Sequence, residues 1–415
     1  KNKMIVNNSI TVFEHKKILF NPQKKEEREI LDALENYYGH YSPYFTLIKN
    51  GVQFNSFVGI IQVGEITIEV LPKADQFGAE RWRTILIDML KEVWGFDVKS
   101  SGTSSLKIKN NSILDLYIEL FIKEVELLLH KGLIKKYRKE EGNRTYLKGA
   151  IEFSKHISKN CTHQELFYVK STEYRFEHVF NQILFKALKL VGQINTNPLL
   201  KSRIGNLFLK FPEMQNIRIS ETSFERLHFD RKSISYKTSI EIAKLLLLNY
   251  HPDISKGSNH VLALMFDMNN LWEQFVFVTL KKKFKSYHVN SQISKNFWKP
   301  SKGNHSKMRP DIVMTHKDSN TNFVLDTKWK NLNGYNPSPD DLRQMFTYHH
   351  YFQAEKTALL YPGENSKIID GFYTNIKDHT TLSDKFCSVI YISTHSQVKE
   401  WQNKLVEFID ISFLS

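Results

Sequence analysis

The sequence is poor in cysteine and lacks both a long apolar run and a signal peptide. Only Cys161 and Cys387 occur among 415 residues, without Cys or His companions at metal-ligand spacing, so neither a disulfide framework nor a zinc site is indicated. No stretch of about 18 apolar residues is present, which argues against a membrane-spanning helix. The first residues have no apolar core or cleavage site. We therefore expect a cytoplasmic protein with no membrane contact.

A phosphate-binding loop of the form Gly-x4-Gly-Lys-Ser/Thr is also absent, so we expect no nucleotide site on this chain. The histidines of the middle region show no i, i+4 pairing and no common acidic neighbour. We interpret them as structural or surface residues rather than metal ligands. Repeats and low-complexity tracts are likewise lacking.

Positive charge is in excess. The chain carries 58 basic and 44 acidic residues, a formal net charge of +14. Such an excess favours a polyanionic partner, and nucleic acid is the leading candidate because cations that neutralise phosphates release counterions. A lysine-rich proteome would produce the same balance. Charge therefore supports a nucleic-acid function without establishing it.

Apolar periodicity divides the chain into three regions and predicts an α+β multidomain protein. The first is a β-rich N-terminal domain with a charged helix near 23–38, a hairpin turn at Gly64-Glu65 and a closing helix from Ala79 to Trp94. The second is mainly helical, and the third alternates strands and helices. We place these regions at 1–110, 111–255 and 256–415.

The middle region contains a densely charged segment at 135–153, centred on Gly142 and Asn143. Its β-prone flanks and central Gly-Asn pair are compatible with a protruding basic hairpin. A solvated loop is the alternative, because charge runs usually lie in solvent.

Two short apolar runs in the last region each deliver an acid to the same end of a predicted hairpin. Asp311 stands in the run Met308 to Val313, and Asp326 stands in the run Phe323 to Lys330. Residues i and i+2 of a strand share a face, so Asp326 and Lys328 should lie side by side, with Asp311 close by. This arrangement predicts a divalent-metal site.

Phosphodiester cleavage requires a nucleophilic water, charge stabilisation and help for the leaving oxygen, and Mg²⁺ held by carboxylates can supply all three. Asp311, Asp326 and the carbonyl of Thr327 are suitable ligands, and Lys328 can orient or help deprotonate the water and neutralise the scissile phosphate. A helix upstream presents Glu273 as a further metal ligand or as an acid of the metal's water shell. A helix downstream presents Gln344 and Tyr348 at i, i+4, where they could contact the DNA backbone.

Each of these residues has a simpler interpretation when taken alone. Asp311 can be a turn acid, Asp326 and Lys328 a surface ion pair, and Glu273 an exposed helix residue. Gln344 and Tyr348 can merely face solvent and core. Only their joint order on suitable elements favours a catalytic site.

That order resembles the PD-(D/E)xK nuclease superfamily. Four segments narrow the resemblance to the McrC family, the endonuclease subunits of McrBC-type modification-dependent restriction systems: Asp267 to Val276, Met308 to Ile312, Leu325 to Lys330 and Asp341 to Met345. The segments Val58 to Gly64, Ile68 to Lys73 and Leu147 to Phe153 are also similar to this family. One departure is Ala150, where the family pattern has an arginine, which leaves a partner contact there undefined.

The resemblance implies a type IV-like restriction endodeoxyribonuclease subunit with an α/β PD-(D/E)xK domain. It implies Mg²⁺ as cofactor, and Asp311, Asp326, Lys328, Glu273, Gln344 and Tyr348 as site residues. It also implies double-stranded DNA and a hexameric McrB-like AAA+ NTPase as partners, with the N-terminal region docking on the ring and the segment 135–153 entering its pore. Two alternatives remain: a catalytically silent activator of the ring, and a stand-alone nuclease for structured DNA.

Overall fold

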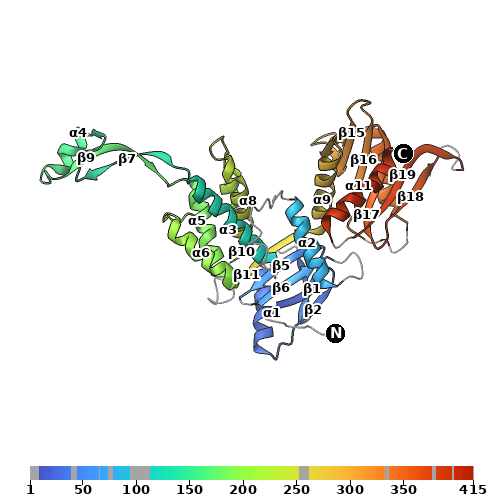
Figure 1. Ribbon diagram of the computed structural model, residues 1–415, viewed down its shortest axis with the longest axis horizontal. Coiled ribbons are helices and arrows are strands. Elements are labelled where there is room, and N and C mark those ends of the chain that lie inside the picture. The colour runs from blue at the N-terminus through green and yellow to red at the C-terminus, as the bar shows by residue number, and fades with distance from the viewer. Residues whose placement is uncertain are drawn as a thin grey trace. The chain divides into compact units, whose positions relative to one another are not determined.

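Helices and β-sheets alternate along the computed structural model (Figure 1). It describes residues 9–38, 44–64, 66–72, 78–93, 113–251, 261–330, 332, 336–375, 380–394 and 397–414. They belong to two units, one drawn from 1–105 and 265–415 and the other from 106–264. This mixture confirms the α+β class, whereas the division at residues 110 and 255 stays a prediction. No helix in these ranges is long and apolar enough to cross a membrane.

The first part of unit 1 contains small sheets and two amphipathic helices. Its elements are β1 (Ser9–Phe13), β2 (Lys17–Leu19), α1 (Lys25–Tyr38), β3 (Phe45–Ile48), β4 (Gly51–Phe54), β5 (Phe57–Val63), β6 (Ile66–Leu71) and α2 (Ala79–Val93). β6 pairs antiparallel with β5 and parallel with β1, and β4 lies between β2 and β3. β4 was not predicted. It approaches β2 so closely that a Cβ on Gly51 would lie 2.1 Å from the Ile18 carbonyl oxygen. Glu65 and Trp94 of the predicted turn and helix lie outside the described residues.

The second part of unit 1 is built on a six-stranded mixed sheet. Its elements are α9 (Met268–Lys283), β12 (Tyr287–Ser291), β13 (Lys295–Trp298), β14 (Ser306–Met308), β15 (Ile312–His316), β16 (Asn322–Thr327), α10 (Pro339–Phe352), β17 (Ala354–Gly363), β18 (Lys367–Thr374), β19 (Leu382–Ser393) and α11 (Val398–Leu414). The strand order is β12-β15-β16-β17-β19-β18, with β16, β17 and β19 parallel and the outer pairs antiparallel. β13 and β14 form a separate two-stranded hairpin.

Helices cover the central strands of this sheet. α10 connects β16 to β17 and packs through Met345, Tyr348 and Phe352 on Val324 and Leu359. α11 packs on β19 and on α9, which itself packs on β12 and β16. Because side chains alternate across a strand, the residues next to Val324 and Leu359 point to the other face of the sheet. The second halves of β17, from Ala358, and of β19, from Phe386, are therefore mostly apolar, as strands buried on both faces usually are.

A cluster of four tryptophans joins the two parts of unit 1. The ring of Trp272 in α9 lies 5.1 Å from Trp401 in α11 and 5.7 Å from Trp329, and the ring of Trp329 lies 6.0 Å from Trp82 in α2. Trp329 Nε1 donates a 2.9 Å hydrogen bond to Glu14 Oε1. Residues from both ends of the chain thus share one core.

Unit 2 is mainly helical, with a long β hairpin. Its elements are α3 (Ile113–Lys131), β7 (Lys136–Arg144), β8 (Ala150–Ile151), α4 (Phe153–Asn160), β9 (Phe167–Arg175), α5 (Val179–Ile194), α6 (Pro198–Lys210), α7 (Glu221–Glu225), α8 (Lys237–Leu248) and β10 (Tyr250–His251), and β11 (Val261–Asp267) leads back to unit 1. α3 packs on α6 and α8, and α5 on the same two helices. The hairpin of β7 and β9 projects from these helices and carries α4 at its far end (Figure 1).

The predicted hairpin exists, but its position was wrong. Gly142 and Asn143 lie inside β7, where they pair with Val169 and Tyr168 of β9, rather than forming a turn. The chain between the two strands forms β8 and α4. Gly149 is the position that requires glycine. Its φ is +87°, and a Cβ there would lie only 2.3 Å from the Lys170 carbonyl oxygen. Long-range pairing with β9 overrode the local turn signal.

We predict that Trp401→Ala lowers the free energy of unfolding of unit 1 by about 3 to 5 kcal/mol, because the side chain is fully buried and its removal leaves a cavity. Trp401→Phe should cost much less, since Trp401 Nε1 has no hydrogen-bond partner among the described residues. Urea unfolding followed by circular dichroism measures both. Trp298→Ala is the control, because that ring is 58% exposed. Equal midpoints for the alanine variants would contradict the packing role.

Candidate functional site

The β15–β16 hairpin brings the two predicted aspartates to one end of the sheet. Its antiparallel register pairs Ile312 with Leu325, so Asp311 comes opposite Asp326. Asp311 Oδ2 accepts hydrogen bonds from the backbone N of Thr327 at 2.7 Å and from Thr327 Oγ1 at 2.9 Å. The predicted hairpin geometry is thereby confirmed, and the Asp311 carboxylate is held in a fixed orientation.

Asp326 and Lys328 form a mostly buried ion pair, as their i, i+2 spacing predicted. Asp326 is 1% exposed, and its Oδ2 lies 2.7 Å from Lys328 Nζ. Burial, followed by the charge of Asp311, raises the pKa of Asp326 to about 6 despite the opposing effect of Lys328. Burial lowers the pKa of Lys328, but Asp326 and Asp341 more than offset this, so its pKa is raised and the ammonium stays charged.

Asp341 also lies beside these residues, although the sequence analysis named it only as the first residue of one McrC-like segment. Its Oδ2 lies 2.7 Å from Lys330 Nζ, and its Oδ1 lies 4.0 Å from Lys328 Nζ. Burial raises the pKa of Asp341, but Lys330 and Ser338 more than offset this and lower it. The N-terminus of α10 thus adds a third carboxylate beside the lysine. No local sequence pattern predicts this contact.

Glu273 joins the site through a residue that was not predicted. Its side chain on α9 is 9% exposed, and Oε1 accepts a 2.8 Å hydrogen bond from Gln292 Nε2. The backbone N of Gln292 donates to the Asp311 carbonyl at 2.9 Å, so one residue links both acids. Gln292 has a left-handed φ of 53°. Burial, with the charge of Asp311 second, raises the pKa of Glu273 to about 7.

Gln344 and Tyr348 share one face of α10, as predicted. Gln344 Nε2 donates a 2.7 Å hydrogen bond to Tyr348 Oη. Tyr348 is 3% exposed, and burial, followed by the charge of Asp326, raises its pKa to about 12. The structure therefore brings all the predicted side chains into one electrostatically coupled group. Their roles stay predictions.

The donor set matches what Mg²⁺ usually takes from a protein. In the described part of the chain, no three His, Cys, Asp or Glu side chains are arranged to hold a metal ion by themselves. Mg²⁺, however, is commonly bound by one or two carboxylates and completes its octahedron with water and phosphate oxygens. Asp326 Oδ2 is buried and has no polar partner among these residues apart from Lys328. Asp311 and Asp326 fit such an ion, and Glu273, which is bonded to Gln292 through Oε1, is the remaining candidate acid.

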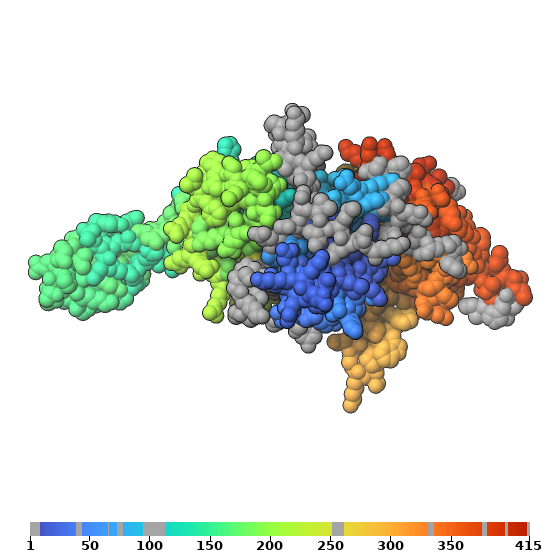
Figure 2. Space-filling view, turned by 90° about the horizontal axis from the view of Figure 1, so that it is seen from below, coloured from blue at the N-terminus to red at the C-terminus, as the bar shows by residue number. Residues whose placement is uncertain are grey.

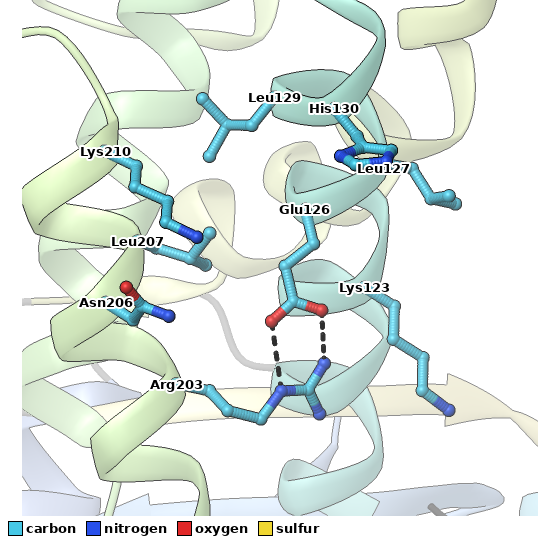
Figure 3. Close-up of a pocket in the computed structure, with 9 residues that line it drawn as sticks. All are labelled: Lys123, Glu126, Leu127, Leu129, His130, Arg203, Asn206, Leu207 and Lys210. Carbon is cyan, nitrogen blue, oxygen red and sulfur yellow. Dashed lines mark hydrogen bonds and ion pairs between the residues drawn. The ribbon is translucent and has the colours of Figure 1, made fainter. Parts of the chain in front are cut away.

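A separate pocket lies in unit 2 between α3 and α6, with a volume of about 520 Å³ (Figure 3). Arg203 makes a two-bond contact with Glu126 there, and Lys123 pairs with Glu119. Two of its cations are thus already neutralised by carboxylates of α3. None of the predicted site residues lines it, so we assign it no role.

A known protein family matches most of the chain, including the residues of this site. The model of the family described as "McrBC 5-methylcytosine restriction system component" matches residues 52–362. The chain belongs to this family. The match spans β4 to β17, including Glu273, Asp311, Asp326 and Lys328, and confirms the resemblance stated from the sequence. No curated protein matches the chain.

Solved structures extend the McrBC likeness to the fold of nearly the whole chain. A chain of the refined half-complex from the tetradecameric assembly of Thermococcus gammatolerans McrB AAA+ hexamers with bound McrC is similar with 19% identity and a TM-score of 0.73. The similarity covers 97% of this chain and 99% of that chain. A chain of the T. gammatolerans McrBC complex gives 21% identity and a TM-score of 0.52, over 68% and 89%. At these identities the likeness shows the fold alone.

The raised pKa of Glu273 predicts a pH-dependent effect of Glu273→Gln on stability without metal. Below about pH 4.5 the carboxyl is protonated in both folded and unfolded chains, so the substitution should change little. Between pH 4.5 and 7 the unfolded chain releases the proton first, and the folded state loses stability. Glu273→Gln should therefore raise the free energy of unfolding at pH 8 by on the order of 1 to 3 kcal/mol.

Thermal unfolding in chelator at pH 4 and pH 8 measures this difference. Glu355→Gln, an exposed acid on β17, is the matched control and should behave alike at both pH values. If the Glu273→Gln protein is no more stable than the unsubstituted chain at pH 8, the burial of a neutral carboxyl at position 273 is contradicted.

Proposed function

We propose that this McrBC family member is a Mg²⁺-dependent DNA endonuclease subunit with a PD-(D/E)xK site. The observation that carries the proposal is the arrangement of Asp311 opposite Asp326, with Lys328 Nζ 2.7 Å from the second carboxylate. A merely structural ion pair would need one acid. Here two further acids, Glu273 and Asp341, gather around the same lysine and aspartates, which raises the electrostatic cost of the site.

The site residues take distinct roles in this proposal. Asp311 and Asp326, with the Thr327 carbonyl and with Glu273 nearby, would hold Mg²⁺, which when bound stabilises negative charge on the scissile phosphate. Lys328 keeps its proton, orients the attacking water and neutralises a phosphate oxygen. Glu273, with a pKa of about 7, can accept a proton near neutral pH. Gln344 holds Tyr348 beside Asp326 and lies near the DNA backbone.

The partner part of the proposal rests on family membership and on unit 2. McrB AAA+ hexamers with bound McrC are described for the similar assembly. We propose that this chain also binds a hexameric AAA+ NTPase and stimulates it. The β7–β9 hairpin is suited to enter a ring because β7 is mostly exposed, and α4 at the far end of the hairpin presents Phe153 at 68% and Ile157 at 67% exposure. The energy for DNA translocation would come from the ring.

We predict that Asp326→Asn abolishes Mg²⁺-dependent cleavage of 5-methylcytosine DNA, while stimulation of the partner NTPase persists. The substitution removes a proposed metal ligand on β16 but leaves unit 2 unchanged. Lys328→Ala should lower the cleavage rate roughly 10²- to 10⁴-fold, since it removes a positioned cation. Gel-based cleavage and phosphate release measure the two activities on the same preparation.

Asp318→Asn is the matched control, because Asp318 lies in the exposed turn between β15 and β16, beyond the strand end opposite to Asp311. It should leave both activities unchanged. Cleavage that persists in Asp326→Asn would refute the site. NTPase stimulation without cleavage in the unsubstituted chain would favour a silent activator, and cleavage without any NTPase would favour a stand-alone nuclease.

The raised pKa values of Asp326 and Glu273 also predict that Mg²⁺ affinity falls as pH falls. Below about pH 6 to 7 these carboxyls hold protons that the ion must displace. The apparent Kd for Mg²⁺ should therefore rise by up to about tenfold per pH unit and per proton displaced. Calorimetric titration at pH 8 and pH 5.5 measures it without substrate. An affinity that is equal at both pH values would argue against these ligands.

A further inference from the structure

The segment between the first and second site acids carries no negative charge. From residue 274 to residue 310 there is no Asp or Glu, whereas the chain as a whole has 44. The same stretch contains nine cations: Lys281, Lys282, Lys283, Lys285, Lys295, Lys299, Lys302, Lys307 and Arg309. Five of them belong to the β13–β14 hairpin and the residue after it. A polyanion approaching this hairpin meets no repulsive charge from its own residues.

The hairpin is anchored beside the site at its base. Lys295 Nζ donates a 2.8 Å hydrogen bond to the Tyr351 carbonyl near the end of α10, and the ring of Phe297 meets the ring of Tyr351 edge to face at 5.3 Å. Met308, which pairs with Lys295, is buried in the core under α10. Three residues after Met308 the chain reaches Asp311. The base of the hairpin is therefore fixed relative to the catalytic acids.

The cationic side chains of the hairpin beyond Lys295 are exposed. Lys299, Lys302 and Lys307 make no ion pair with any described residue, although ion pairs with carboxylates are common elsewhere in the chain. Trp298 is 58% exposed at the end of β13. In Figure 2 a narrow light-orange projection, in the colour of residues near 300, extends from the surface of unit 1. Unpaired cations next to an exposed ring are the combination that contacts nucleic acid backbones and bases.

We infer that the β13–β14 hairpin is a DNA-contacting arm, in which Lys299, Lys302 and Lys307 neutralise backbone phosphates beside Asp311 and Trp298 packs against the same DNA. This inference rests on the proposed nuclease function and adds the surface that positions the substrate. Phosphate contacts fix the register of a duplex without reading its sequence. The arm therefore sets where the scissile phosphate lies, and selection of the modified base is left to other parts of the system.

The test measures DNA binding by the full chain carrying Asp326→Asn, so that no cleavage occurs. Fluorescence anisotropy with a labelled duplex is recorded over a series of salt concentrations. The triple substitution of Lys299, Lys302 and Lys307 by Ala should weaken binding roughly 10- to 100-fold and reduce the slope of log K against log salt by about 2 to 3. Trp298→Ala should weaken binding while leaving that slope unchanged.

The matched control replaces three other exposed lysines by Ala: Lys281 and Lys285 from the start of the acid-free region, and Lys317 from the same sheet. Lys281 lies in the last turn of α9, and Lys317 follows β15 at the strand end opposite to Asp311. The control should retain the affinity and salt slope of the reference. Unfolding midpoints of all variants should match that of the Asp326→Asn chain, because every side chain substituted in addition is exposed.

The outcomes separate the inference from the function on which it rests. If the reference chain binds duplex and the triple variant binds equally well, the arm is refuted while the nuclease site stands. If the control loses as much affinity as the triple variant, binding is diffuse and the arm is likewise refuted. Light scattering should show the same mass for all variants, and a triple variant that changes its oligomeric state would mark the hairpin as a contact between copies instead. A reference chain that binds no DNA overturns both proposals.

Discussion

The contact between Asp311 and Thr327 is the constraint on which the site depends. One carboxylate oxygen accepts from both the backbone N–H and the hydroxyl of Thr327, at the point where β15 and β16 diverge. This contact fixes the hairpin register at its end, and the register places Asp326 opposite Asp311. Because a shift of one residue would turn Asp326 and Lys328 to the other face of the sheet, the geometry of the proposed site depends on this pairing. Gln292 strengthens it from the side of Glu273.

The site gathers negative charge where the fold excludes water. Burial, followed by the charge of Asp311, raises the pKa values of Asp326 and Glu273. Lys328 offsets only part of this effect at Asp326, and Gln292 and Arg309 offset only part of it at Glu273. Without a cation, the ionised forms of these carboxyls therefore destabilise the folded state at neutral pH. Such unfavourable charge clusters are typical of sites that bind a charged ligand. The unpaired lysines of the β13–β14 hairpin supply the complementary positive surface just outside. Acids inside and cations outside suit a metal ion and a phosphate backbone arriving together.

Local patterns predicted the parts of this site that depend on local geometry. Strand alternation placed Asp326 beside Lys328, and helical spacing placed Gln344 beside Tyr348. Contacts between distant segments could not be predicted. Nothing near Gln292 or Asp341 indicates their partners, and the partner of β7 lies beyond an intervening helix, so the Gly142–Asn143 turn signal misled. Glu14 and Trp329, which are 315 positions apart, could be joined only by the complete fold.

That last contact has a consequence for when this core can form during synthesis. Glu14 and Trp82 leave the ribosome early, but the ring that completes their core, Trp401, belongs to the final helix. It stacks on Trp272, the neighbour of Glu273 on α9. The core beneath α9 is therefore complete only after Trp401 has been added to the chain. A chain made only as far as β19 would already carry Asp311, Asp326 and Lys328 but would still lack the packing of Trp401 on Trp272.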